Sequence, residues 1–425
     1  MDVGLPVELR YYEKTVHNTW RMSYDLLSEH AQRMLWLMAY LQRDRITQEI
    51  FERAASNIDV FEPMVALNDV DSQAPSDVKS YLGSLLGSDE AWDLDCFLRT
   101  MTEIRSCSLI SFDHVNRSYE LHPLVQGWIR TTIPHSTDVA LAQSTFLLAL
   151  SIDKKEGAQD YAYRRSLELH LNSIMQHQTQ IQPGCAAAFG HVFFELGQYG
   201  LASALQLQVV EATTSKLGRK HLCTLWAVEE LAYTYQAQLL YKQAETLQVE
   251  VLKGRKQILG DKHIDTLEAM EDLANTYCRQ GLYKQAEMLH VQVLEERKQT
   301  LGFRHSKTLD AMNCLASTYS GQGLHKQAEA LLVQVLEGRR QALGDKHPDI
   351  LTAMSFLATT YYEQRLYKQA EALQVQVLEA SKQVLGNKHP DTLIAMNNLA
   401  VTYKSQGLYS QAEVLLVPAL QTGRE

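Results

Sequence analysis

The sequence predicts an all-α protein in which a right-handed solenoid of two-helix repeats follows a small domain with one β-hairpin. Leu-Gly, followed two residues later by a basic residue and His, recurs as LGRKH, LGDKH, LGFRH, LGDKH and LGNKH, beginning at 217, 259, 301, 343 and 385. The step is 42 residues each time, and a constant step of this size is the mark of stacked repeats. Residues 17–133 lack this period and contain two short segments typical of strands.

Each period contains two amphipathic segments. In one period these are TLEAMEDLANTYCRQ at 266–280 and YKQAEMLHVQVLEERKQTL at 283–301. Leu267, Met270 and Ala274 share one face of the first segment, because apolar residues three and four apart align on a helix. The pattern predicts one helix-turn-helix unit per repeat.

Small residues recur where the two helices are expected to cross. Alanine occupies two columns at the same step, Ala232, Ala274, Ala316, Ala358 and Ala400, and Ala244, Ala286, Ala328, Ala370 and Ala412. A larger side chain in either column would push the helices apart. Between the helices Gly281, Gly323 and Gly407 suit a left-handed turn. Leu239 and Arg365 replace glycine in two repeats, so we expect those two turns to close differently.

A degenerate copy precedes the regular ones. Phe189, Phe193, Tyr199 and Ala202 lie 42 residues before Leu231, Tyr235, Tyr241 and Ala244. The array is therefore expected to span 176–425, with about six repeats of 42 residues.

These residues resemble the tetratricopeptide repeat. The segments LGNKHPDTL, NNLAVTY and QGLYSQAEVL resemble in particular the repeats of kinesin light chains. The resemblance covers roughly 176–425 and implies a non-catalytic scaffold that binds a protein or an extended peptide in a concave groove. A kinesin-light-chain-like cargo adaptor is the alternative that it implies.

The N-terminal region has another pattern, which favours a winged-helix-like domain at 17–134 after an extension at 1–16 and before a helical linker at 135–175. Its expected elements are helices at 19–27, 29–42, 47–55, 92–105 and 123–133, a polar insert at 56–90, and strands at 108–113 and 118–122. Two short strands joined by a tight turn are typical of a hairpin.

The phrases TWRMSYDLLSEHAQRMLWLMAYL and YELHPLVQGWIR resemble the winged-helix segment of STAND ATPases, also called NB-ARC or NACHT receptors. In that family a Met-His-Asp motif contacts the nucleotide, and the matching residues here are Leu121, His122 and Pro123. No GxxxxGK[ST] loop occurs in the sequence, so we expect the nucleotide contact of His122 to be vestigial. The resemblance implies the rear part, or a remnant, of a receptor in which repeats follow this module.

Charge and hydropathy narrow the class of partner. Lys plus Arg total 40 against 50 for Asp plus Glu, a formal charge of -10, which disfavours nucleic acid and anionic membranes. No basic and apolar leader and no apolar run near the roughly 20 residues of a membrane span occur, so we expect a cytoplasmic protein. DNA binding by the winged helix is disfavoured too, because phosphate would meet a net negative surface over 1–135.

Neither a metal site nor a catalytic site is indicated. The histidines of the recurring motif are a repeat apart, too far to share one ion, and more plausibly occupy repeat junctions. The six cysteines form no CxxC pair and are expected to be free thiols. HExxH and GxSxG motifs are absent, so we expect no enzyme activity and no cofactor.

The exposed side of each first helix should form the partner-binding surface. By resemblance, the contacting residues are Glu229, Glu230, Tyr233, Gln236, Glu271, Asp272, Asn275, Arg279, Asn313, Ser317, Ser320, Ser355, Thr359, Tyr362, Glu363, Asn397, Asn398 and Lys404. The first two of these helices are acidic, which favours a basic peptide docking toward 229–279. An uncovered last repeat would also allow self-association.

Overall fold

The structure is a computed structural model, and it describes residues 19–59, 69–88, 90–132, 136–153, 157–178, 180–343, 347–384, 386–387 and 389–422. The chain forms two compact units, Met1–Gln238 and Leu239–Glu425. The N-terminal extension expected at 1–16 lies outside the described residues.

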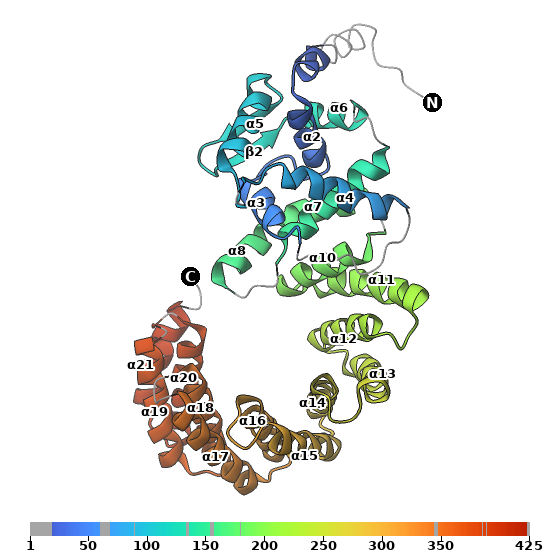
Figure 1. The fold of residues 1–425 in the computed structure, drawn as a ribbon. Helices are drawn as coiled ribbons and strands as arrows, with labels where there is room; N and C mark the ends of the chain where they lie inside the picture. Colours follow the sequence, from blue (N-terminus) through green and yellow to red (C-terminus); the bar gives the residue numbers. More distant parts are fainter. Residues whose placement is uncertain are drawn as a thin grey trace, which may run out of the picture. The chain divides into compact units, whose positions relative to one another are not determined.

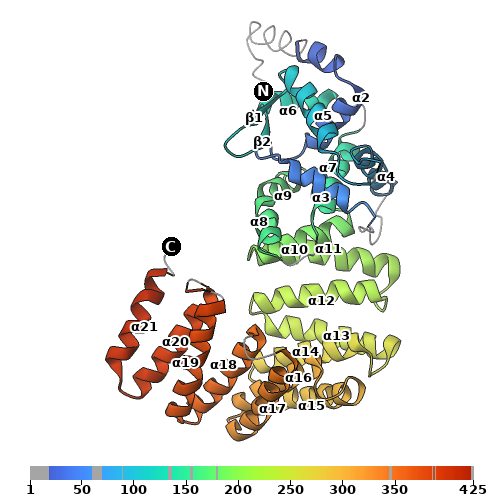
Figure 2. The same cartoon turned by 60° about the vertical axis from the view of Figure 1, so that its left-hand side comes forward.

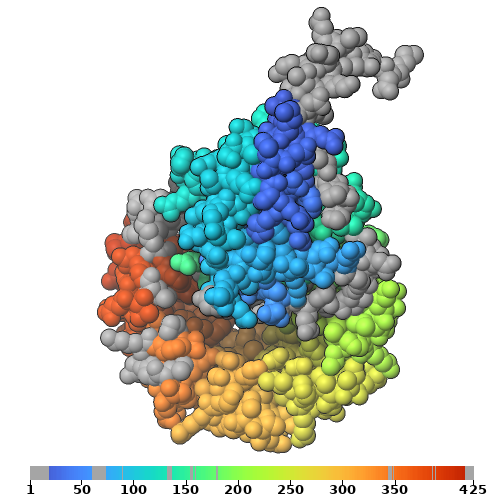
Figure 3. Space-filling model, turned by 45° about the horizontal axis from the view of Figure 1, so that its top comes forward, coloured from blue at the N-terminus to red at the C-terminus, as the bar shows by residue number. Residues whose placement is uncertain are grey.

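The first unit contains one hairpin among helices (Figure 1). After a helical stretch at 19–25, its elements are α2 (Glu29–Met38), α3 (Gln48–Ser56), α4 (Asp69–Gly83), α5 (Leu94–Ser106), β1 (Ile110–Asp113), β2 (Ser118–Leu121), α6 (Pro123–Thr132), α7 (Thr137–Ser151), α8 (Ala158–Ser166), α9 (Glu168–Met175), α10 (Pro183–Glu195), α11 (Tyr199–Leu217) and α12 (Leu222–Ala237). In Figure 3 the blue and cyan atoms of its N-terminal part form one closely packed face.

The predicted hairpin is confirmed. β1 and β2 pair antiparallel with Ile110 opposite Leu121, and Tyr119 also bridges to Ile46 before α3. Phe97 and Tyr119 then meet beneath the hairpin at a ring distance of 6.0 Å. The strands are held against α5 because alternate residues, among them Ile110 and Leu121, are buried.

Two helices have roles that the sequence pattern did not show. α4 lies inside the segment interpreted as a polar insert, 56–90, and buries Val78, Tyr81 and Leu82. α7 lies in the segment interpreted as a linker and packs against α2, α3, α4 and α10. Its sequence is apolar on nearly every side, which is typical of a central helix.

The second unit consists of antiparallel helix pairs in regular succession (Figure 2). Its helices are α13 (Tyr241–Leu259), α14 (Ile264–Arg279), α15 (Tyr283–Thr300), α16 (Ser306–Gly321), α17 (His325–Leu343), α18 (Pro348–Glu363), α19 (Tyr367–Val384), α20 (Pro390–Ser405) and α21 (Tyr409–Thr422). Each helix packs on the next along the chain. Within this unit α14, α16, α18 and α20 line the inner side of a curve, and the odd-numbered helices form its outer side (Figure 1). The predicted helical repeats are thereby confirmed.

The alanine columns lie where the helices approach most closely. Ala274, Ala316, Ala358 and Ala400 of the inner helices are at most 1% exposed, and Ala286, Ala328, Ala370 and Ala412 of the outer helices are fully buried. Burial at every repeat confirms the inference that these positions must stay small.

The turns without glycine do not close differently, and that expectation was wrong. Arg365 has φ of 64° and Leu239 has φ of 62°, close to the 77° of Gly281 and of Gly323. The turn geometry is therefore kept, and the two side chains accept a left-handed backbone that costs L-residues roughly 1–2 kcal/mol. Packing of the adjoining helices outweighs this local preference.

The recurring histidines begin the inner helices. In His221, His263, His305, His347 and His389, Nδ1 accepts a hydrogen bond at 3.2 Å from the backbone N–H two residues later. An N-cap of this kind satisfies one of the donors that a helix leaves unpaired at its start. The predicted place of these histidines at repeat junctions is confirmed.

Candidate functional site

The inner face of the second unit is the exposed side of α14, α16, α18 and α20. Three or four residues separate its members along each helix, because the intervening residues are buried against the outer helices. We define the inner face as Glu268, Glu271, Asp272, Asn275, Arg279, Asp310, Asn313, Ser317, Ser320, Thr352, Ser355, Phe356, Thr359, Tyr362, Glu363, Ile394, Asn397, Asn398, Val401 and Lys404.

Fourteen residues of the inner face are among those that the sequence indicated on these four helices. The remaining four predicted residues, Glu229, Glu230, Tyr233 and Gln236, lie half-buried on α12 in the first unit. Sequence reasoning omitted Glu268, Asp310, Thr352, Phe356, Ile394 and Val401. Their positions, one helical turn beyond or beside the chosen residues, carried the signal that would have identified them.

Glu271 is engaged within the protein. Its two carboxylate oxygens accept hydrogen bonds from Arg297 on α15 at 3.1 and 2.8 Å, and the side chain of Arg297 is only 4% exposed. The same guanidinium donates to the backbone carbonyl of Lys307 on α16 at 2.9 Å. Arg297 thus ties together three consecutive helices, and a two-pronged pair of this kind is geometrically specific.

Other inner-face carboxylates are also paired. Lys307 lies 2.7 Å from Glu268, and Arg339 donates to Asp310. Arg339 and Arg255 repeat the second contact of Arg297, each donating at 2.9 Å to a carbonyl at the start of the next inner helix. The negative charge that the sequence suggested for this end of the groove is therefore largely offset by internal cations.

The other end of the inner face is uncharged and partly apolar. Phe356 is 46% exposed, Ile394 57% and Val401 39%. Asn397 and Asn398 lie beside Ile394 on α20, and Tyr362 reaches α20 through a 2.9 Å hydrogen bond with Ser405. This surface combines amides that can bond a peptide backbone with apolar groups that gain from being covered.

The interior behind the inner face contains neutral polar groups. His290, 1% exposed, shares a hydrogen bond of 2.8 Å with Thr318, and burial lowers its pKa to about 4. Burial raises the pKa of the Cys314 thiol to about 12, so this cysteine is protonated and a poor nucleophile at neutral pH. Both groups contribute to packing and carry no chemistry to the surface.

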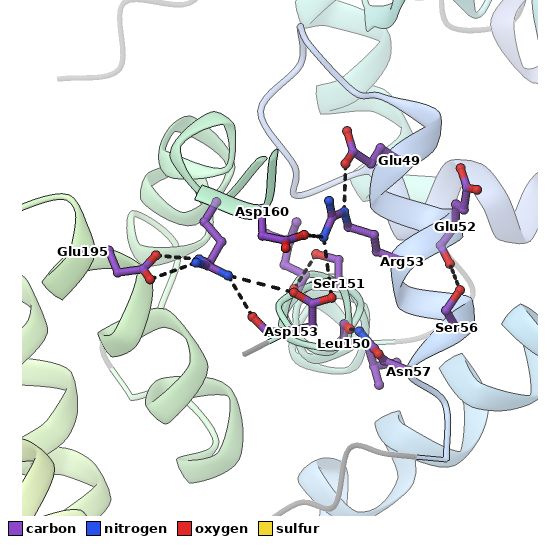
Figure 4. Close-up of polar contacts among 12 residues, drawn as sticks. Glu49, Glu52, Arg53, Ser56, Asn57, Leu150, Ser151, Asp153, Asp160 and Glu195 are labelled. Atoms are coloured by element: carbon purple, nitrogen blue, oxygen red, sulfur yellow. Dashed lines mark hydrogen bonds and ion pairs between the residues drawn. The ribbon is translucent and has the colours of Figure 1, made fainter. Parts of the chain in front are cut away.

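A polar cleft of about 670 Å³ lies in the first unit beside α3 (Figure 4). There Arg53 pairs with Glu49 and Asp160, each at 2.8 Å, and lies 3.6 Å from Asp153. Arg164 pairs with Glu195 on α10 at 2.9 Å and also lies near Asp153. These charges neutralise one another, so the cleft joins α3, α8 and α10 and offers little free charge to a ligand.

His122 caps a helix. Its Nδ1 accepts a hydrogen bond from the backbone N–H of Leu124 at 3.3 Å, at the start of α6. The contact is the same two-residue cap that the repeat histidines make, and it accounts for the residue without a nucleotide.

Among the described residues, no three His, Cys, Asp or Glu side chains are grouped so that they could hold a metal ion. None of the helices, over the same parts of the chain, has the length and apolar character needed to cross a membrane. An open, ligand-sized face on a regular helical array remains, which defines the class as a helical-repeat protein with an extended interaction surface.

The comparisons agree with this class. The tetratricopeptide repeat family matches residues 227–299, 307–383 and 357–421, so the chain carries tetratricopeptide repeats. The crystal structure of a Podosopora anserina putative kinesin light chain with nearly identical TPR-like repeats is 28% identical, with 47% of this chain and 93% of that chain covered, at a TM-score of 0.42 to 0.43.

Two further solved structures are similar at lower identity. BtubC (BKLC) from P. vanneervenii is 18% identical over 54% of this chain and 91% of that chain, with a TM-score of 0.44. The apo form of the quorum sensor NprR from B. thuringiensis is 11% identical over 83% of this chain and 99% of that chain, with a TM-score of 0.45. No curated protein matches the chain.

Proposed function

We propose that this protein is a non-catalytic scaffold that binds an extended peptide or protein partner along the inner face. The observation that carries the proposal is the run of exposed side chains on four successive helices whose opposite sides are buried. A stacked array displays such residues at a constant interval, which suits a partner that is itself extended.

The chemistry of the inner face supports a peptide ligand. Asn275, Ser317, Thr359 and Asn397 are exposed, one on each inner helix. Amides and hydroxyls can donate to and accept from the N–H and C=O groups of an extended chain. An extended peptide needs such partners because it makes few hydrogen bonds within itself.

A basic partner is a finer form of the proposal, and it has weaker support. Glu268, Glu271 and Asp310 would attract Lys or Arg, yet each is already paired within the protein. A basic ligand would have to compete with Arg297 and Lys307 for these oxygens, so it would gain little affinity from them.

The relationship of the N-terminal region is also a proposal. The hairpin between α5 and α6, together with the phrase YELHPLVQGWIR, supports a winged-helix-like domain at 17–134 related to STAND receptors. The motif LGNKHPDTL supports the alternative, a cytoplasmic cargo adaptor of kinesin-light-chain type, and self-association through the last repeat is open to either. A P-loop encoded in frame upstream would favour the receptor, whereas heptad repeats there would favour the adaptor.

Affinity capture with the intact chain tests the scaffold function. Ser317→Trp with Thr359→Trp would place two bulky groups on the inner face, whereas Ala330→Trp alters an exposed position of α17 on the outer side. Partners identified by mass spectrometry should be lost with the inner-face variant and kept with Ala330→Trp. Retention of the same partners by both variants would contradict the proposal.

A further inference from the structure

Three exposed apolar side chains of the inner face are confined to two helices. Phe356 takes the place held by Asp272 and Cys314 in the two preceding inner helices. Ile394 likewise replaces Glu268, Asp310 and Thr352, and Val401 replaces Asn275, Ser317 and Thr359, in a sequence that repeats every 42 residues. Scattered exposed apolar residues are ordinary, but a group that interrupts a polar stripe indicates a surface that is covered in use.

The register of the helices brings the three together. Neighbouring inner helices meet between residues 39 to 43 apart, as the contacts Glu268 to Lys307 (2.7 Å), Cys278 to Thr318 (3.3 Å) and Tyr362 to Ser405 (2.9 Å) show. By the same register Phe356 on α18 lies alongside residues 395–399 of α20. This stretch is flanked by Ile394 and Val401, and it includes Asn397 and Asn398.

Charge separates this surface from the rest of the inner face. Residues 352–362 and 392–403 contain no charged side chain, whereas α14 carries Glu268, Glu271, Asp272 and Arg279. A charged ligand group would lose its water here without gaining a counter-charge. An apolar group would lose nothing polar and would cover the exposed parts of Phe356 and Ile394.

We propose that Phe356, Ile394, Val401, Asn397 and Asn398 form an anchor site for a bulky apolar side chain of an extended, locally uncharged peptide. The inference rests on the proposed function, since it specifies which part of the partner the inner face selects. Apolar contact with the three hydrophobic residues supplies affinity, and the two amides hold the peptide backbone on either side of the anchor.

Selection from a random peptide library on the intact chain tests the anchor. The repeats themselves supply conservative variants, because Phe356→Asn introduces the residue of the next repeat and Ile394→Thr that of the preceding one. Met288→Thr is the matched control, since Met288 is 67% exposed on outer helix α15 and the preceding repeat has Thr246 there. Circular dichroism of each variant establishes that it is folded.

The selected peptides should share an aromatic or large aliphatic residue flanked by uncharged residues. Their affinity, measured by fluorescence anisotropy, should fall about tenfold or more in the double variant F356N/I394T and by less than twofold in M288T. Equal affinity for the double variant and the wild type, or enrichment of Lys and Arg in place of apolar residues, would overturn the anchor while leaving the scaffold function intact.

Two other outcomes reach further. Failure to enrich any peptide beyond the level of the Ser317→Trp, Thr359→Trp variant would overturn both the anchor and the scaffold function. A concentration-dependent dimer in analytical ultracentrifugation that F356N/I394T abolishes would assign the patch to a second copy of the chain and overturn the peptide anchor.

Discussion

Arg297 and Glu271, 26 residues apart on α15 and α14, form a buried ion pair that crosses from the outer to the inner layer of the second unit. Because Arg297 also bonds the carbonyl of Lys307, it joins one repeat to the next. Glu271 therefore holds the array together and is not free for a ligand. The pair also shows why the formal charge of exposed helices overestimates the field that a partner would meet.

Replacing Arg297 with Leu should destabilise the second unit by about 3 kcal/mol, because Glu271 would remain largely buried without its counter-charge. Urea unfolding followed by circular dichroism measures the change. Lys326→Ala, at an exposed lysine of α17, is the control and should change the free energy of unfolding by less than about 0.5 kcal/mol. Equal stability of both variants would show that the pair contributes nothing.

The histidine caps can be tested by exchange. His305→Ala should cost about 1 kcal/mol, since the backbone N–H of Lys307 loses its acceptor. His305→Asn should recover most of the loss, because an asparagine oxygen is a good N-cap acceptor. Thermal unfolding of the three proteins decides, and an alanine variant as stable as the wild type would contradict the cap.

Arg365→Gly should stabilise the protein by about 1 kcal/mol. The residue has φ of 64°, which glycine adopts without steric cost. The reciprocal change, Gly323→Ala, should destabilise, since Gly323 has φ of 77° in the equivalent turn. A decrease in melting temperature for Arg365→Gly would mean that the arginine side chain contributes more than the strained backbone costs.

Buried histidines should make stability depend on pH. The pKa of His290 is lowered to about 4 by burial, so between pH 6.5 and 4 the unfolded chain binds a proton that the folded chain does not. Stability is therefore lost as the pH falls through this window, by roughly 2 kcal/mol between pH 7 and 5. His170 in the first unit behaves alike, with a pKa lowered to about 4 by burial.

His290→Leu, which copies Leu332 of the next repeat, removes one of these groups. The free energy of unfolding of this variant, measured in urea at several pH values, should fall less steeply below pH 6.5 than that of the wild type. Parallel pH profiles for the two proteins would argue that His290 is protonated in the folded state.

Periodic features were predictable from the sequence, and features of single sites were not. The 42-residue step identified the helix pairs, the alanine columns and the histidine junctions, because stacking imposes the same environment on every repeat. The Arg297 to Glu271 pair was missed, since only a three-dimensional register brings α14 and α15 into that contact. Phe356 was set aside because an exposed aromatic residue looks like a disruption of the polar pattern when it is read from sequence alone.

The first unit was harder to predict for a physical reason. α7 is apolar on almost all sides, so its sequence shows no amphipathic face that would reveal its neighbours. α4 contains Pro75 and acidic residues, which favoured an irregular insert, yet it buries Val78 and Leu82. Tertiary packing decided both cases against the local pattern.

Site-specific photo-crosslinking tests the central claim most directly. A benzophenone side chain placed at Thr359 on the inner face should crosslink to a captured partner, whereas the same group at Ala330 on the outer side should not. Crosslinks from Ala330 with none from Thr359 would show that partners bind elsewhere on the repeats and would contradict the proposed function.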